Sequence, residues 1–140
     1  MKTVVSFLFA FSAIAFGFNS SAGTPDPVLQ FSNGLMAVAQ WEKGPVLEEE
    51  SIMTLQFLEQ GTGESVALDD NLSVKLWMPD MGHGSAPTEV ENILNSEGQA
   101  IEGYYRVKEM YFLMAGFWQI EVSLTNKKGE TETQILELTL

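Results

Sequence analysis

The chain alternates apolar and polar residues with a period of two over much of its length after residue 34. The apolar faces of the alternating stretches are Leu35, Ala37, Ala39 and Trp41; Met53, Leu55 and Phe57; Val74, Leu76 and Met78; Trp118, Ile120, Val122 and Leu124; and Leu136, Leu138 and Leu140. Residues that favour turns separate these stretches, as at 42–45, 59–63 and 126–129. Alternation with such breaks predicts half-buried antiparallel strands.

The same pattern predicts the fold class. No stretch has the apolar spacing and capping residues of an amphipathic helix, and the segment 89–95 fits either a short helix or a strand. About seven short strands within about 105 residues are typical of an immunoglobulin-like two-sheet antiparallel β-sandwich, with a single closed barrel as the alternative. The stretch Gly103-Tyr104-Tyr105 places a tyrosine just after a glycine near the start of a late strand, which fits either a tyrosine corner that ties one sheet to the preceding loop or simple packing at a sheet edge.

The N-terminus has the three parts of a secretory signal peptide. Lys2 gives a positive charge, an apolar stretch follows at 4–18, and Ser20 and Ala22 are the small residues that signal peptidase requires. A transmembrane anchor is the alternative, but the apolar stretch is shorter than the roughly 20 residues that span a bilayer. We therefore expect cleavage of residues 1–22, a flexible leader at 23–34, one domain at 35–140, and a periplasmic or secreted location.

The net charge of the chain after cleavage limits the kinds of partner that it can bind. After cleavage, 19 acidic and six of the seven basic residues remain, which gives a formal charge of −13. Such a surface repels nucleic acid and anionic lipid and attracts cations or basic proteins, so we expect no nucleic-acid partner and no stable membrane insertion. The alternative is that the acidity only keeps an exported protein soluble.

The residues needed for common enzyme chemistry are scarce. The chain has one histidine and no cysteine, and Gly61-Thr62-Gly63 lacks both the lysine and the helix of a phosphate-binding loop. No serine lies in a nucleophile-elbow context beside which His83 could act. We therefore expect a protein that is not an enzyme.

One loop concentrates soft metal ligands. Met78, Met81 and His83 fall within six positions, in a stretch that contains Pro79, Gly82, Gly84 and Pro87. Thioether sulfur and imidazole together suit Cu(I) better than any hard cation. Met114, at the end of a later apolar stretch, could add a ligand if the fold brings it to the same end of the domain. The alternatives are that Met78 belongs to the core, that Met81 fills a gap, and that His83 is simply exposed.

The order of these pieces resembles the YtkA-like and FixH-like group. The resemblance covers roughly residues 35–125 and rests on Met-Pro-Asp-Met-Gly-His at 78–83, Gly-Tyr-Tyr at 103–105 and Met-Ala-Gly-Phe-Trp at 114–118. It implies an exported or membrane-tethered immunoglobulin-like domain linked to copper handling or to the assembly of copper-containing oxidases. Met78, Met81 and His83 are the candidate metal ligands on the matching positions. A cleaved signal peptide favours the YtkA-like branch, because FixH-type proteins keep their membrane helix.

Three functions follow as hypotheses. The first is a Cu(I) carrier or buffer that exchanges copper with a donor or acceptor protein of the cell envelope. The second is a metal-free interaction module, an accessory to oxidase assembly, whose Met-rich loop contacts a partner. The third is a small-solute-binding domain that uses Trp41, Trp77 or Trp118.

Overall fold

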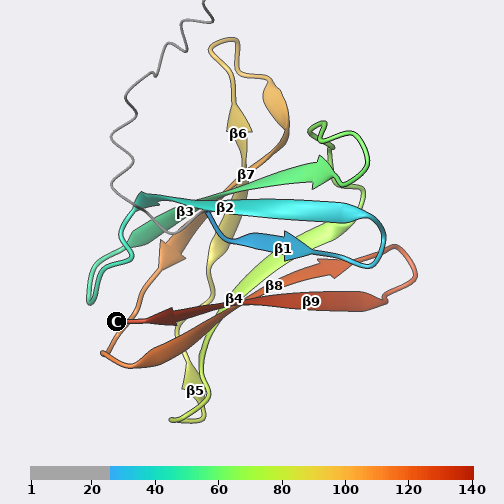
Figure 1. Cartoon of the computed structure of the whole chain (residues 1–140). Coiled ribbons are helices and arrows are strands. Elements are labelled where there is room, and N and C mark those ends of the chain that lie inside the picture. The colour runs from blue at the N-terminus through green and yellow to red at the C-terminus, as the bar shows by residue number, and fades with distance from the viewer. Residues whose placement is uncertain (1–25) are drawn as a thin grey trace, which may run out of the picture.

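The structure, a computed structural model, describes residues 26–140, and every regular element in that part of the chain is a strand. The strands are β1 (Val28–Gln30), β2 (Leu35–Lys43), β3 (Ser51–Glu59), β4 (Asn71–Met78), β5 (His83–Gly84), β6 (Glu89–Leu94), β7 (Ala100–Met110), β8 (Phe117–Thr125) and β9 (Thr131–Thr139). They form a five-stranded sheet, β1-β2-β3-β7-β6, and a four-stranded sheet, β5-β4-β8-β9 (Figure 1). All paired strands are antiparallel, so the predicted all-β two-sheet sandwich is confirmed.

The long strands follow the order of a constant-type immunoglobulin domain. With β2, β3, β4, β6, β7, β8 and β9 lettered A to G, the two sheets read A-B-E-D and C-F-G. The remaining strands, β1 and β5, have three and two residues. The expected strands are therefore the long ones, and the segment 89–95, which the pattern left open, carries strand β6.

The segment 23–34, predicted as a leader to the domain, carries strand β1 in its described part. Strand β1 lies within it and pairs with β2, and the side chains of Leu29 and Phe31 are only 5% and 3% exposed. A strand of three residues is too short to show alternation, which is why the pattern did not reveal it. The predicted signal peptide lies outside the described residues. Between residues 26 and 140 no helix is long and apolar enough to cross a membrane.

The alternating apolar faces meet between the two sheets. The buried core residues that come from the predicted faces are Ala37, Ala39, Met53, Leu55, Phe57, Val74, Leu76, Met78, Trp118, Ile120, Val122, Leu124 and Leu136. Phe112 joins them and meets Trp118 edge to face, with ring centroids 5.4 Å apart. Such aromatic pairs add about 0.5–1.5 kcal/mol beyond the apolar area they bury. Since no cysteine is present, packing between the sheets holds this fold together.

Tyr105 ties the sheets together differently from the predicted tyrosine corner. Its side chain lies within β7, and its hydroxyl accepts a hydrogen bond of 3.0 Å from the main-chain N–H of Leu68. Leu68 belongs to the connection between β3 and β4, not to the turn that precedes β7. The ring also packs edge to face on Phe57, with centroids 5.7 Å apart. The tyrosine therefore fastens the connection by which the chain passes from one sheet to the other.

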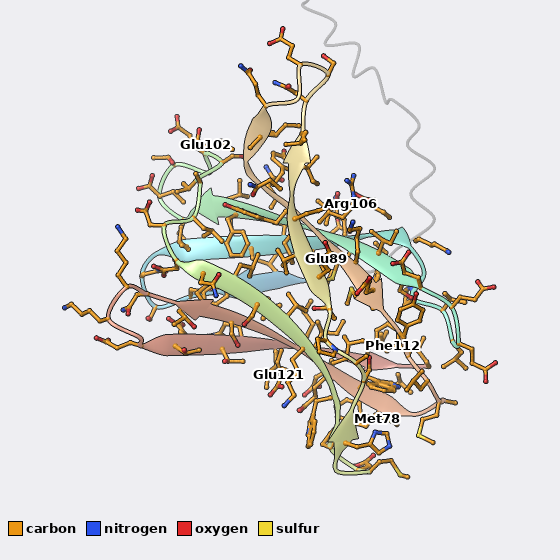
Figure 2. All side chains as sticks on the ribbon, turned by 180° about the vertical axis from the view of Figure 1, so that it is seen from behind. Met78, Glu89, Glu102, Arg106, Phe112 and Glu121 are labelled. Atoms are coloured by element: carbon orange, nitrogen blue, oxygen red, sulfur yellow. The ribbon has the colours of Figure 1, made fainter. Side chains whose placement is uncertain are left out.

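Three connections meet at one end of the sandwich, which we call the hairpin pole. They are the β2–β3 loop at 44–50, the β4–β5 hairpin at 79–84 and the β7–β8 connection at 111–116. Trp77 near the end of β4 pairs with Gln119 near the start of β8, and Leu47 forms a bridge to Phe112. Figure 2 shows Met78 and Phe112 at this pole, with Glu102 at the far end of the molecule.

Candidate metal centre

The β4–β5 hairpin holds its shape through two glycines with different tasks. The main-chain N–H groups of Met81 and Gly82 both donate to the carbonyl of Met78, at 3.3 and 2.9 Å. Gly82 has φ +65°, a left-handed conformation that glycine adopts without steric cost. At Gly84 a Cβ would lie 2.5 Å from the main-chain oxygen of Leu76, so only glycine lets β5 approach β4 this closely. The glycines singled out in the sequence are thus structural requirements of this hairpin.

Met78 and His83 are cross-strand partners in this hairpin. Their Cα atoms are paired in the β4–β5 register, and directly opposed residues of an antiparallel pair project to the same face of the sheet. The neighbouring pair obeys this rule, because a Cβ at Gly84 would meet the ring of Trp77 at 3.4 Å. Met78 faces the core, so its thioether and the imidazole of His83 lie on the inner face.

The two partners differ in exposure. Met78 is 3% exposed, whereas His83 is exposed and its Nδ1 lies 3.3 Å from the carbonyl oxygen of the next residue. Met81 occupies the tip of the hairpin and is 56% exposed. Met78 is therefore part of the core, as the alternative interpretation held, and at the same time lies beside the sole histidine. A side chain in this place can serve packing and metal binding together.

The segment that carries Met114 reaches the same pole. The alternation of Met110, Phe112 and Met114 predicts one shared strand face, but β7 ends at Met110. Met110 is fully buried, and Met114 lies beyond the strand and is 39% exposed. The buried indole of Trp118 donates from Nε1 to the carbonyl of Met114, at 3.0 Å. This hydrogen bond fixes the main chain of Met114, and its signal in the sequence is the Met-Ala-Gly-Phe-Trp spacing.

Gly116 links this segment to the hairpin. Its N–H and carbonyl exchange hydrogen bonds of 2.8 and 3.0 Å with Leu140, and a Cβ on Gly116 would lie 2.9 Å from the Cε of Met78. The terminal methyl group of Met78 therefore reaches the connection that carries Met114. The hairpin that carries Met78, Met81 and His83 and the connection that carries Met114 thus lie beside each other.

The donor types fit a soft monovalent ion. Three thioethers and one imidazole are available at the pole, a set that suits Cu(I) and offers little to Mg²⁺ or Ca²⁺. Within residues 26–140 no group of three or more His, Cys, Asp or Glu side chains is placed to hold a metal. The predicted donors Met78, Met81, His83 and Met114 thus have no such group of carboxylates and imidazoles as a competitor in this part of the chain.

Four of the titratable groups with shifted pKa values lie on the outer face of the five-stranded sheet; the fifth, Glu132 of β9, has its pKa lowered by hydrogen bonds from Ser32. Arg106 Nε lies 3.0 Å from Glu42, its Nη1 lies 3.5 Å from Glu91, and Lys108 Nζ lies 2.9 Å from Glu91. Hydrogen bonds from Arg106 lower the pKa of Glu42, and the bond from Lys108 lowers the pKa of Glu91. This ion-pair ladder joins β2, β7 and β6, so we assign it to the stability of the sheet.

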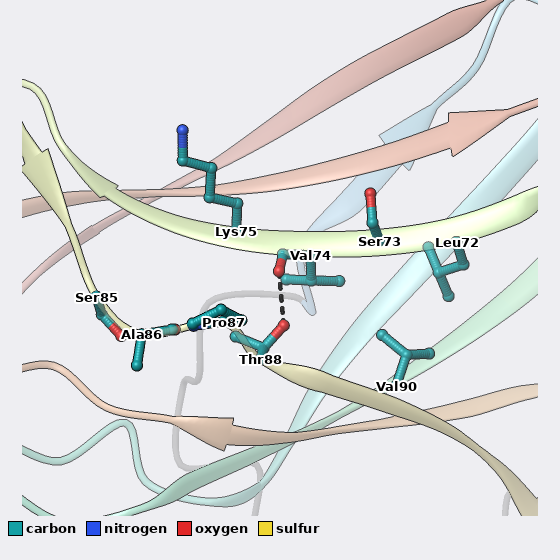
Figure 3. A pocket seen from close by; sticks show the side chains of 9 residues that line it. All are labelled: Leu72, Ser73, Val74, Lys75, Ser85, Ala86, Pro87, Thr88 and Val90. Atoms are coloured by element: carbon teal, nitrogen blue, oxygen red, sulfur yellow. Dashed lines mark hydrogen bonds between the residues drawn. The ribbon is translucent and has the colours of Figure 1, made fainter. Parts of the chain in front are cut away.

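A hollow of about 500 Å³ lies beside the free edge of β4, where no sequence pattern predicted one (Figure 3). Its walls are largely aliphatic, including Val74 and Val90, and the hydroxyl of Thr88 donates to the carbonyl of Val74 at 2.6 Å. The charged lining residue, Lys75, holds its Nζ 4.6 Å from the centroid of the Trp77 ring. The hollow thus has no converging set of reactive groups.

The three tryptophans considered for solute binding are dispersed. Trp118 is fully buried in the core, and Trp41 is half-buried with its ring 6.1 Å from that of Phe112. Trp77 is half-buried beneath Lys75 on the outer face of the four-stranded sheet. They do not form a shared aromatic platform.

Comparisons with known proteins agree with the fold. A family model described as YtkA-like matches residues 30–123, a range that contains the hairpin and the Met114 segment. No curated protein matches the chain. A crystal structure of a DUF4426 family protein from Pseudomonas aeruginosa PAO1 is similar, with 13% identity, 82% of this chain and 96% of that chain covered, and a TM-score of 0.55. At that identity the likeness supports the β-sandwich fold alone.

Proposed function

Because this chain belongs to the YtkA-like family, we propose that it is an exported protein that binds Cu(I) through Met78, Met81, His83 and Met114 and carries or buffers the ion without catalysing a reaction. The cross-strand pairing of Met78 with His83 is the observation that carries this proposal. Residues paired in this way have Cβ atoms about 4.5–5.5 Å apart, a separation that lets a thioether and an imidazole reach one ion.

The arrangement suits an ion that must be held and then released. Met78 supplies a sulfur from the core, and the main chain around it is fixed by the hairpin and by Gly116. Met81 and Met114 are exposed, so these outer ligands are open to exchange with a second protein. Neutral thioethers hold copper without the charge of a thiolate, which favours transfer over permanent storage.

An anaerobic Cu(I) titration against a chromophoric chelator tests the proposal. We expect His83→Ala and Met81→Ala to weaken binding relative to the native protein, because each removes one donor from an exposed position. Met36→Ala, a similar change on a half-buried methionine of β2, serves as the control and leaves the affinity unchanged. Equal affinity in all four proteins would refute the site.

Export is part of the same proposal and has its own test. The secreted or periplasmic fraction is expected to contain a chain that begins at Gly23, as measured by intact mass. A chain that retains residue 1 in the membrane fraction would contradict cleavage after Ala22.

A metal-free interaction module is the second candidate, favoured by the 56% exposure of Met81 at the hairpin tip. The two candidates differ in thermal stability. A ligand that binds only the native state raises the melting temperature, whereas Cu(I) leaves the melting temperature of a metal-free module unchanged. A melting temperature that does not change at saturating Cu(I) therefore favours the second candidate.

A further inference from the structure

Exposed apolar side chains gather at the hairpin pole. They are Leu47 (37% exposed), Met81 (56%), Tyr111 (36%), Leu113 (56%) and Met114 (39%). The bridge between Leu47 and Phe112 holds the β2–β3 loop against the β7–β8 connection, and Gly116 holds that connection against the side chain of Met78. These contacts bring the exposed residues of all three connections to one end of the molecule. Apolar residues concentrated in this way mark an interaction surface, whereas single exposed ones do not.

Acidic side chains border this surface. Glu48 and Glu49 are exposed beside Leu47, and the N–H of Glu48 donates to the carbonyl of Phe112 at 3.0 Å. Asp80 is exposed beside Met81 at the hairpin tip. The three segments that build the pole, 44–50, 79–84 and 111–116, contain no lysine or arginine. Lys43, directly before the first of these segments, is an exposed basic neighbour. An apolar centre with a predominantly acidic border is complementary to a partner with an apolar centre and a basic border.

We infer that the hairpin pole is the docking surface for the protein that exchanges copper with this chain, and that this partner presents basic side chains around its own metal-binding face. The inference rests on the proposed function, because the exposed Met81 and Met114 are both proposed ligands and members of the surface. Contact at this surface brings the outer thioethers to the partner's metal, so ligands can be replaced one at a time. The acidic border raises the rate of encounter, and the apolar centre holds the complex.

Defined peptides can test the charge preference. Two synthetic peptides share one Met- and His-containing Cu(I)-binding core and are flanked either by lysines or by glutamates. We expect the lysine-flanked peptide to transfer Cu(I) to the exported protein at least about tenfold faster at low salt, as electrostatic steering predicts. The advantage should shrink toward physiological ionic strength, where the screening length is about 8 Å. Equal rates for the two peptides would overturn the inference.

Charge-matched variants distinguish the effect of the acidic residues at the pole from the effect of the net charge of the protein. The pole variant carries Glu48→Gln, Glu49→Gln and Asp80→Asn, and the control variant carries Glu64→Gln, Glu97→Gln and Glu102→Gln. All six side chains are exposed, and each variant removes the same number of negative charges. The preference for the lysine-flanked peptide is expected to fall only in the pole variant. An equal fall in both variants would show that net charge alone attracts the peptide.

The apolar centre is tested by a second matched pair. Leu113→Gln changes a side chain of the pole that is 56% exposed, and Leu94→Gln changes one in β6 that is 57% exposed. Binding of the metal-free lysine-flanked peptide, followed by fluorescence anisotropy, should weaken severalfold for Leu113→Gln alone. Equal weakening in both would contradict an apolar contact at the pole.

These measurements distinguish a failed docking surface from a failed copper site. If the exported protein does not compete for Cu(I) with a chelator, the proposed function fails, and the copper-exchange partner fails with it. If Cu(I) binds but neither matched pair behaves as expected, only the docking surface is wrong.

Discussion

Replacing Met78 by leucine separates its observed packing in the core from its proposed role as a copper ligand. Met78 is 3% exposed and packs in the core between the sheets. A change from methionine to leucine conserves volume and costs less than about 1.5 kcal/mol, whereas truncation to alanine would cost about 2–5 kcal/mol. Leucine removes the sulfur, however, so loss of this ligand is expected to raise the Cu(I) dissociation constant at least about tenfold, which corresponds to about 1.4 kcal/mol of binding free energy. Met78→Leu should therefore fold almost normally and bind copper poorly.

Two assays on the same protein measure these effects. Urea denaturation gives the free energy of unfolding without metal, and anaerobic competition with a chelator gives the affinity for Cu(I). Met53→Leu is the control, because Met53 is 1% exposed in the other sheet and is expected to tolerate the change without any effect on copper. The reasoning is refuted if Met78→Leu binds Cu(I) as tightly as the native protein, since Met78 would then be a core residue only.

Three further predictions concern the scaffold. Tyr105→Phe removes the hydrogen bond to the β3–β4 connection and should lower the free energy of unfolding by about 1 kcal/mol in urea denaturation; an unchanged midpoint would contradict this. Gly116→Ala combines a φ of +139° with a Cβ 2.9 Å from Met78 Cε, so we expect both lower stability and a shifted Met78 methyl resonance, and an unmoved resonance would show that this contact is not made. Arg106 lowers the pKa of Glu42 in the folded protein, so this ion pair stabilises the fold fully above pH ~4.5, and the stabilisation is lost as the pH falls through the lower folded pKa. In Arg106→Gln the free energy of unfolding should therefore depend less steeply on pH in the acid range, and an unchanged slope would refute this.

The strands of the fold could be predicted from the sequence because successive side chains of a strand point to opposite faces, so that burial of one face produces alternation of apolar and polar residues. In β3 and β8 the predicted apolar positions are buried along the whole strand. The order of the strands within each sheet did not follow from the alternation, because it depends on contacts between distant parts of the chain. Strand β1 was not predicted because three residues cannot show a period of two, although Leu29 within it and Phe31 directly after it are buried. The role of Tyr105 was predicted only in part. The sequence indicated a tyrosine that fastens a loop, but the residue that donates to its hydroxyl, Leu68, lies 37 residues earlier in the chain. Local spacing cannot specify a hydrogen bond of that range.

The candidate centre could be predicted only as a set of residues. The hairpin ligands lie within six positions, so chain geometry alone places them together, and Gly82 and Gly84 explain how. Met114 depended on topology. Strand β7 must end before it and β8 must begin beside β4, and neither fact is local. The sequence places Trp118 on an apolar face and among the tryptophans considered for solute binding, but it does not reveal that the indole Nε1 donates to the carbonyl of Met114.

The graded exposure of the three thioethers has a consequence for damage by oxidants. Methionine is converted to its sulfoxide more readily where peroxide can reach the sulfur, and the product is polar and reversible by reductases. Met81 and Met114, at 56% and 39% exposed, would be modified first, while Met78, at 3%, is shielded by the packed sandwich. Mild oxidation would then disable the outer half of the centre and leave the fold intact. Oxidation of the two outer methionines would thus be a reversible modification of the folded domain, because reductases convert their sulfoxides back to thioethers.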